Sequence, residues 1–192
     1  MKLTQIIKYI LDNWRTRSCR EANGGKKHAP SIFLTGDFTE YDLAALRNWA
    51  LTYCPEREGS LHGCEHWDKV AWFGRQLSRQ SEADLTVVLT FAYLHDVERY
   101  NDTDDAQHGP RTAKLVDSLR NGLLQKLSQE QINLLKEACS KHTSTIKTGN
   151  RTVDICFDAH RLDLPRCGIR VNPRLLATKQ ARSYMKIHSD IV

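Results

Sequence analysis

The stretch ADLTVVLTFAYLHD, residues 83–96, is a strongly apolar run that ends in the dipeptide His95-Asp96. At 3.6 residues per turn, one face of this run holds Leu85, Val88, Leu89 and Ala92. His95 and Asp96 continue the same face, so we expect both side chains to point into the core. An unpaired buried charge costs several kcal/mol, and a bound cation would remove that cost. The run therefore predicts a buried helix that ends at a metal site.

Further segments place a histidine or an aspartate on an apolar stripe. In the helical segment 61–77, His66 begins a stripe that continues through Val70, Phe73 and Leu77. In the segment 128–142, a capping-box pair precedes a stripe formed by Ile132, Leu135, Cys139 and His142. In the segment 152–166, Asp158 lies in surroundings too apolar for a surface carboxylate. Any one of these residues alone is better explained as a helix cap or a hydrogen-bonded core residue, so the prediction depends on the whole set.

For two histidines, His108 and His142, the sequence allows more than one structural interpretation. Pro110 is suited to the first turn of a helix, which would leave His108 in the preceding loop, free to turn inward. His142 is either a ligand or a histidine at a helix C-terminus, where the helix dipole favours it. Several helices that each deliver an imidazole or a carboxylate predict a metal site within an all-helical bundle.

The order His66, His95-Asp96, Asp158 resembles the signature of the HD superfamily of metal-dependent phosphohydrolases. The segments HGCEHWDKV, FAYLHDVERYND, QHGPRTA and FDAHRLDLPRCGI together resemble an uncharacterised bacterial branch of that superfamily, over about residues 58–182. That branch usually reads DADRLD where this chain reads DAHRLD. The departure leaves Asp158 intact, and we assign no role to His160 from the sequence.

The resemblance implies an all-α fold, a single HD-type helical bundle over residues 41–192, preceded by an N-terminal helix and polar loop over residues 1–40. The resemblance also implies that the direct metal ligands are His66, His95, Asp96 and Asp158. Whether a second ion is present stays open; it would take its imidazoles from His108 and His142, with Asp96 bridging. A mixed imidazole and carboxylate set suits Mn, Fe, Co, Ni, Zn or Mg, one or two ions per chain.

We expect hydrolysis of a phosphate ester of a small molecule or nucleotide by a metal-activated water. Asp96, Glu98 and Arg99 are the candidate catalytic residues, with Glu98 or Asp102 orienting the water. His62, Arg99 and Arg161 are the candidate substrate contacts. Glu98 is equally explained as half of a surface ion pair, and Arg161 and Arg166 as partners of Asp158 or Asp163. Two other functions stay open, a di-iron oxygenase and a non-catalytic metal-bound sensing module.

Composition agrees with one domain. The chain has 192 residues, enough for one sizeable core, and a formal net charge of +5, which supports an anionic ligand only weakly. Its six cysteines form no C-x-x-C pair, which argues against a zinc-thiolate site. Lys8 and Asp12 interrupt the apolar N-terminus, where we expect an amphipathic helix over residues 3–17 and no signal peptide. We expect a cytoplasmic protein without membrane or nucleic-acid partners, and leave homo-oligomerisation open.

Overall fold

Seven α-helices and three short 3-10 helices make up the regular structure that a computed structural model describes, over residues 34–188 without 35, 58 and 80. In chain order they are α2 (Glu40–Tyr53), η1 (Pro55–Arg57), α3 (Cys64–Ser78), α4 (Leu85–Leu94), α5 (His108–Leu119), α6 (Gln129–Lys141), α7 (Arg151–Arg161), η2 (Leu164–Cys167), η3 (Pro173–Leu175) and α8 (Lys179–Ile187). These residues contain no strand, so the predicted all-α class is confirmed. The helix expected over residues 3–17 lies outside the described residues.

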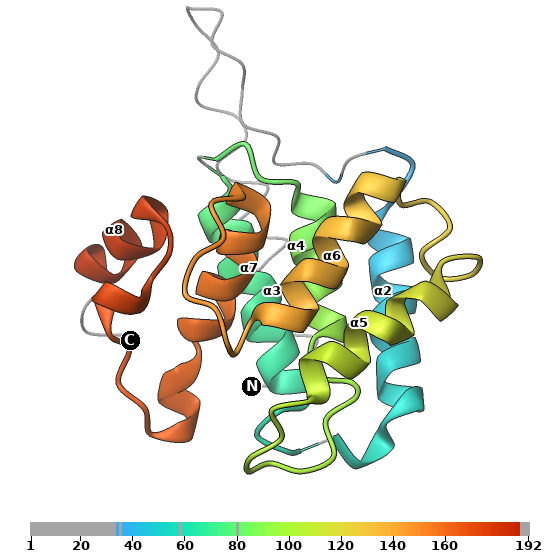
Figure 1. The fold of residues 1–192 in the computed structure, drawn as a ribbon, viewed down its shortest axis with the longest axis horizontal. Helices are drawn as coiled ribbons and strands as arrows, with labels where there is room; N and C mark the ends of the chain where they lie inside the picture. The colour runs from blue at the N-terminus through green and yellow to red at the C-terminus, as the bar shows by residue number, and fades with distance from the viewer. Residues whose placement is uncertain (1–33, 35, 58, 80, 189–192) are drawn as a thin grey trace, which may run out of the picture.

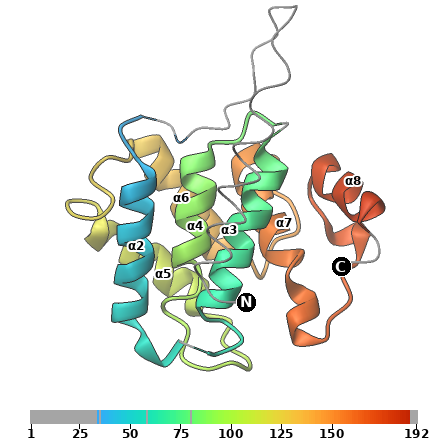
Figure 2. The ribbon, with the colours of Figure 1, turned by 180° about the vertical axis from the view of Figure 1, so that it is seen from behind.

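Helix α4 lies at the centre of the bundle and packs against α2, α3, α6 and α7, as Figures 1 and 2 show from opposite sides. Every residue of α4 except Tyr93 is buried, so the helix buries far more than the single predicted face. The hydroxyl group of Thr90 donates to the main-chain oxygen of Thr86 at 2.7 Å, which satisfies a polar group inside the apolar core. Burial of each valine or leucine side chain contributes about 1.5–3 kcal/mol, so α4 holds its C-terminal end firmly in the interior.

Side chains that accept hydrogen bonds from main-chain amides fix where the helices begin. Asp84 accepts from the amides of Thr86 and Val87 at the start of α4. At the start of α6, Ser128 and Gln131 form the predicted capping box. Such caps stabilise a helix by about 1 kcal/mol and fix its first residue. They thereby also fix which residues reach the far end of each helix.

Helix α7 is buried on all sides, between the central bundle and the C-terminal segment that ends in α8 (Figure 1). On one side it packs against α3, α4 and α6, and on the other against α8. All residues from Thr152 to His160 are buried. Because side chains two positions apart on a helix point about 200° apart, neighbouring residues of α7 enter different surroundings.

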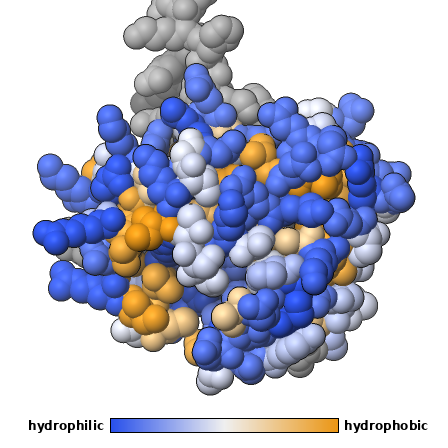
Figure 3. Space-filling model, viewed as in Figure 1, coloured by the Kyte–Doolittle hydropathy of each residue, from blue (hydrophilic) through white to orange (hydrophobic). Residues whose placement is uncertain are grey.

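The outer surface carries most of the charge. The face drawn in Figure 3 is predominantly hydrophilic, with apolar side chains in a few restricted patches. Among the described helices, none combines the length and the apolar character that crossing a bilayer requires.

Candidate metal centre

The buried end of α4 delivers His95 and Asp96 into the interior, where both residues are 0% exposed. His95 is the C-cap of α4, and its Nδ1 lies 3.2 Å from the carbonyl oxygen of Phe91 and 3.1 Å from that of Ala92. A carbonyl oxygen can only accept, so Nδ1 carries the hydrogen of this ring. The Nε2 lone pair of His95 therefore points away from α4, into the centre of the bundle.

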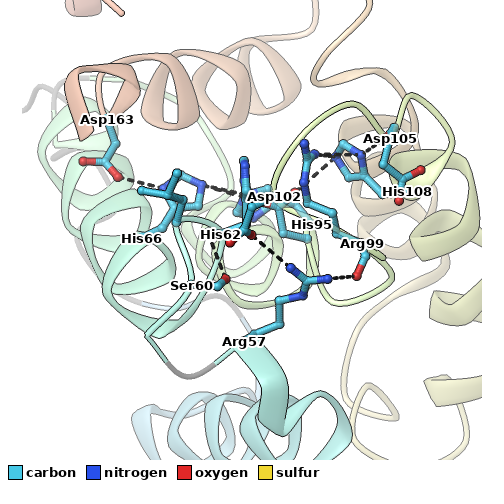
Figure 4. Close-up of polar contacts among 12 residues, drawn as sticks. Arg57, Ser60, His62, His66, His95, Arg99, Asp102, Asp105, His108 and Asp163 are labelled. Atoms are coloured by element: carbon cyan, nitrogen blue, oxygen red, sulfur yellow. Dashed lines mark hydrogen bonds and ion pairs between the residues drawn. The ribbon is translucent and has the colours of Figure 1, made fainter. Parts of the chain in front are cut away.

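Helix α3 brings His66 to the same place, as the sequence predicts. Its Nε2 lies 3.1 Å from Nε2 of His95, although the two residues are 29 positions apart in the chain. On the other side of the ring, Nδ1 lies 2.7 Å from the Asp163 carboxylate (Figure 4). Asp163 thus orients the imidazole and keeps the hydrogen on Nδ1, an arrangement common for histidines that bind metals.

A second pair of imidazoles comes from α5 and α6. Nε2 of His108 lies 3.0 Å from Nε2 of His142. Their Nδ1 atoms face the carbonyl oxygens of Asp105, at 2.5 Å, and Cys139, at 2.8 Å. His142 is the C-cap of α6, whereas His108 is the first residue of α5 and not the loop residue that Pro110 suggested. Both side chains are nonetheless directed inward, since both residues are almost fully buried.

The carboxylate of Asp96 lies between the two pairs. Its Oδ2 is 3.3 Å from Nε2 of His95 and 3.7 Å from that of His66. Its Oδ1 is 3.1 Å from Nε2 of His108 and 3.8 Å from that of His142. Oδ1 is buried, and no hydrogen-bond donor among the described residues satisfies it. One carboxylate is therefore shared by two groups of potential ligands.

His160 joins the first group, which the sequence analysis did not predict. One donor atom each from His66, His95, Asp96 and His160 all lie within 4.8 Å of one another, as do donor atoms of Asp96, His108 and His142. The ring centroid of His160 is 5.3 Å from those of both His66 and His95. A sequence signal for it existed, because His160 continues an apolar stripe of α7 formed by Val153, Cys156 and Phe157.

The prediction that Asp158 is a ligand is wrong. Asp158 points to the opposite side of α7 from His160, toward the segment that leads into α8. Its Oδ1 accepts from the amide of Ala177 at 2.8 Å, and its Oδ2 accepts from the amide and hydroxyl of Thr178 at 2.8 and 2.7 Å. Thr178 is the N-cap of α8, so this buried carboxylate joins α7 to the start of α8.

The donor atoms fit a bound cation. In four imidazoles the hydrogen sits on Nδ1, so the Nε2 atoms present lone pairs to one another and to the Asp96 carboxylate. Lone pairs about 3 Å apart repel, whereas a cation between them is attracted by all of them. Neighbouring ligands at about 2.1 Å from one ion are expected to lie about 3.0–3.4 Å apart. Four of the observed separations, 3.0–3.3 Å, fall in this range, and the other two, 3.7 and 3.8 Å, are longer.

The protonation states also suit metal binding. Burial opposes the charge of Asp96, but the surrounding imidazoles outweigh it and hold the pKa of this carboxyl well below its usual range. Burial lowers the pKa of His142 to about 4 and holds the pKa of His66 and His160 well below the usual value. Ionised carboxylates and neutral imidazoles are the forms that bind metal ions, so no proton must leave these residues at neutral pH.

His62 and Arg99 lie at the edges of the site. His62 precedes α3, and its Nδ1 lies 3.0 Å from Oδ2 of Asp96 and 3.2 Å from Nη2 of Arg166. Arg99 Nη1 lies 3.1 Å from Nδ1 and 3.4 Å from Nε2 of His108. The carbonyl oxygen of Asp105 lies closer to Nδ1, at 2.5 Å, so we assign the hydrogen of that ring to Nδ1. Both residues lie beside the buried group, and their contact with a substrate stays a prediction.

Glu98 and Arg161 do not belong to the site. Glu98 accepts a hydrogen bond from the hydroxyl of Tyr53 at 2.5 Å, which raises the pKa of that tyrosine to about 12. Glu98 makes no hydrogen bond or ion pair with any described histidine. Arg161 donates to the carbonyl oxygens of Thr145 and Ile146, which lie between α6 and α7, and its guanidinium is 3.6 Å from Asp158. Of the two alternatives for Arg161, the structure therefore supports an ion pair with Asp158 over a substrate contact. Asp102, the other candidate for orienting water, pairs with Arg57 at 3.1 Å (Figure 4).

Gly109 allows α5 to approach α6 closely enough for His108 and His142 to meet. A Cβ atom at this position would overlap the carbonyl oxygen of Cys139 and lie 3.4 Å from Cε1 of His142. Because the overlap is with backbone, Gly109→Ala must push α5 away from α6. We expect a loss of about 1–3 kcal/mol of stability and weaker binding at the pair His108 and His142. Chemical denaturation measures the first effect, and metal content per chain measures the second.

The matched control is Gly122→Ala, because a Cβ atom there meets only the carbonyl oxygen of Leu119 at an ordinary 3.8 Å. Equal stability and metal content in the two variants would show that the close approach at Gly109 does not matter.

No protein-family model, curated protein or solved structure matches this chain. Two findings therefore rest on this structure alone: the all-helical fold of the described residues, and the buried histidine and aspartate group that can hold a metal ion. The likeness to the HD superfamily remains a resemblance of motifs, and an activity must be argued from the residues of the site.

Proposed function

We propose that this protein is a metal-dependent phosphohydrolase of the HD type that cleaves a phosphate ester of a small molecule or nucleotide. The observation that carries the proposal is the shared carboxylate of Asp96, with one oxygen facing each group of imidazoles. Two-metal hydrolases of phosphate esters commonly use such a bridging arrangement. A cytoplasmic location is part of the same proposal.

The ligands of one ion would be His66, His95, His160 and Asp96, and those of a second Asp96, His108 and His142. Divalent ions held there supply Lewis acidity and lower the pKa of a bound water toward neutrality. The chain itself contributes the orientation of the ligands. Asp163 and three main-chain carbonyl oxygens hold the Nδ1 hydrogens, so the Nε2 atoms face the centre in advance.

His62 and Arg166 are placed to act on the substrate. The side chain of His62 is 11% exposed, whereas those of His66, His95, His108 and His142 are at most 1% exposed. His62 therefore lies at the accessible edge of the group, with the Arg166 guanidinium 3.2 Å away. Arg166 favours an anionic phosphoryl oxygen at this edge. The His62 imidazole can hold a proton beside it and donate that proton to the leaving oxygen.

Phosphate release from a panel of phosphorylated metabolites and nucleotides, with protein loaded separately with Mn, Fe, Co, Ni or Zn, tests the proposal. We expect release with at least one substrate and ion, and its loss in His62→Gln with metal content retained. An imidazole-rich pair of sites also suits two irons, which keeps the di-iron oxygenase as a second candidate. Oxygen consumption by the iron-loaded protein, with no phosphate release under any condition, would favour that candidate.

Removal of the ions is expected to lower the melting temperature. Ions that bind only the folded chain stabilise it by about 2.7 kcal/mol when their free concentration is about 100 times Kd. For a chain of this size that corresponds to roughly 5–10 °C. Calorimetry before chelation, after chelation and after readdition of zinc measures the shift. An unchanged melting temperature in all three states would contradict metal binding at the buried group.

A further inference from the structure

We infer that His160 is a direct ligand and that it makes the centre imidazole-rich, so that the protein selects Fe, Co, Ni or Zn and discriminates against Mg. This inference deepens the proposed function and rests on it for the presence of a metal centre. It concerns which ions the site accepts, and so can be tested without a substrate.

The position of His160 supports a ligand role. Its ring lies against three other imidazoles, with centroid distances of 5.3 Å to His66, 5.3 Å to His95 and 5.0 Å to His142. Its Nδ1 is buried and finds no hydrogen-bond partner among the described residues. A buried ring nitrogen without a partner is costly, and the cost disappears if that nitrogen, Nδ1, binds the ion. His160 thus lacks the hydrogen bonds that would explain it as an ordinary core histidine.

Nearby carboxylates are engaged elsewhere and leave Asp96 as the one acidic member of both groups of described residues. Asp163 accepts from His66 and lies near Lys69 and Arg166. Asp105 pairs with Arg111 at 2.5 Å and accepts from the amide of Tyr100. The two groups therefore offer five imidazoles and one carboxylate.

This donor set has clear chemical preferences. Imidazole nitrogen suits Zn, Ni and Fe, whereas Mg prefers oxygen ligands and retains its waters. A single carboxylate also offsets only a small part of the charge of two divalent ions. The loaded centre would remain strongly positive, which favours an anionic substrate at the edge formed by His62 and Arg166.

Competition between ions tests the selectivity. Metal-free wild type is equilibrated with limiting Zn or Ni in a large excess of Mg, and the bound ions are measured by elemental analysis. We expect the wild type to bind Zn or Ni at least about 100-fold more tightly than Mg. His160→Asp should reduce that ratio by about 10-fold or more, because a carboxylate replaces an imidazole. The control His188→Asp changes a histidine at the end of α8, beside Tyr184, and should leave the ratio unchanged. Equal ratios in wild type and His160→Asp would overturn the inference.

A measurement on the wild type covers the case in which the variant does not fold. In ¹⁵N-histidine-labelled protein loaded with Zn, a metal-bound ring nitrogen is distinguished by its chemical shift. Of the eight histidines in the chain, we expect five to show it. The His160→Gln spectrum assigns one of them, provided that this variant folds. Four shifted histidines, with both groups occupied, would overturn the role of His160.

The outcomes separate this inference from the proposed function. Five zinc-bound imidazoles together with no phosphate release would contradict the phosphohydrolase and support the ligand role of His160. Phosphate release with a Mg-loaded centre and only four shifted imidazoles in the Zn-loaded protein would do the reverse. A chain in which no imidazole responds to zinc would contradict both.

Discussion

Asp96→Asn is expected to abolish binding of both ions and the stabilisation that they supply. The carboxylate is shared by both ligand groups, so its loss affects them together. Without metal, the wild type holds an ionised side chain, 0% exposed, whose Oδ1 has no hydrogen-bond donor among the described residues. In Asp96→Asn an amide of the same shape removes the charge that both ligand groups share.

Elemental analysis and melting curves, each with zinc and with chelator, measure these effects for Asp96→Asn. We expect the bound zinc to fall from about two ions per chain to background and the zinc-dependent rise in melting temperature to vanish. Phosphate release should fall by about 10³-fold or more, since metal stabilisation of developing charge is worth several kcal/mol.

Glu98→Gln is the matched control for Asp96→Asn. It makes the same chemical change two residues further along, at a carboxylate that accepts a hydrogen bond from Tyr53. This variant should still bind both ions. Retention of one ion by Asp96→Asn would contradict the shared role of this carboxylate.

Hydrophobic periodicity predicted the parts of the site that lie on helices with one clear buried face. His66 and His142 each lie on an apolar stripe, and His95 with Asp96 ends a strongly apolar run. For such residues the sequence determines the direction of the side chain, because only one face can point inward. The structure brings all four residues together.

Periodicity failed where a helix is buried on every side. Along α7 both Asp158 and His160 are surrounded by buried residues, so the sequence does not show which neighbour each side chain faces. The resemblance of motifs favoured Asp158, and the packing of α8 against α7 decided otherwise.

The prediction of where α5 starts failed for a local reason. The first amides of a helix need no acceptor, so Pro110 fits at the third position as well as at the first. Contacts such as that between Asp163 and His66, 97 residues apart, have no local signal at all.

Asp158→Asn is expected to behave in the opposite way to Asp96→Asn. It should keep both ions and lose about 2–3 kcal/mol of stability with or without metal. The carboxylate oxygens accept three hydrogen bonds, from the amide of Ala177 and from the amide and hydroxyl of Thr178. An asparagine oxygen can serve the two donors of Thr178, but its NH₂ group then faces the amide of Ala177. Two donors confront each other in a buried place, beside the guanidinium of Arg161.

Denaturation curves and zinc content for the two asparagine variants, measured in parallel, distinguish a structural carboxylate from a ligand. We expect Asp158→Asn to shift the unfolding midpoint equally in zinc and in chelator, because the start of α8 is loosened while the ligands stay in place. Loss of zinc from folded Asp158→Asn would restore the ligand role that the HD signature suggested. It would also require α7 to turn so that position 158 faces the bundle, and His160 could then no longer reach His66 and His95.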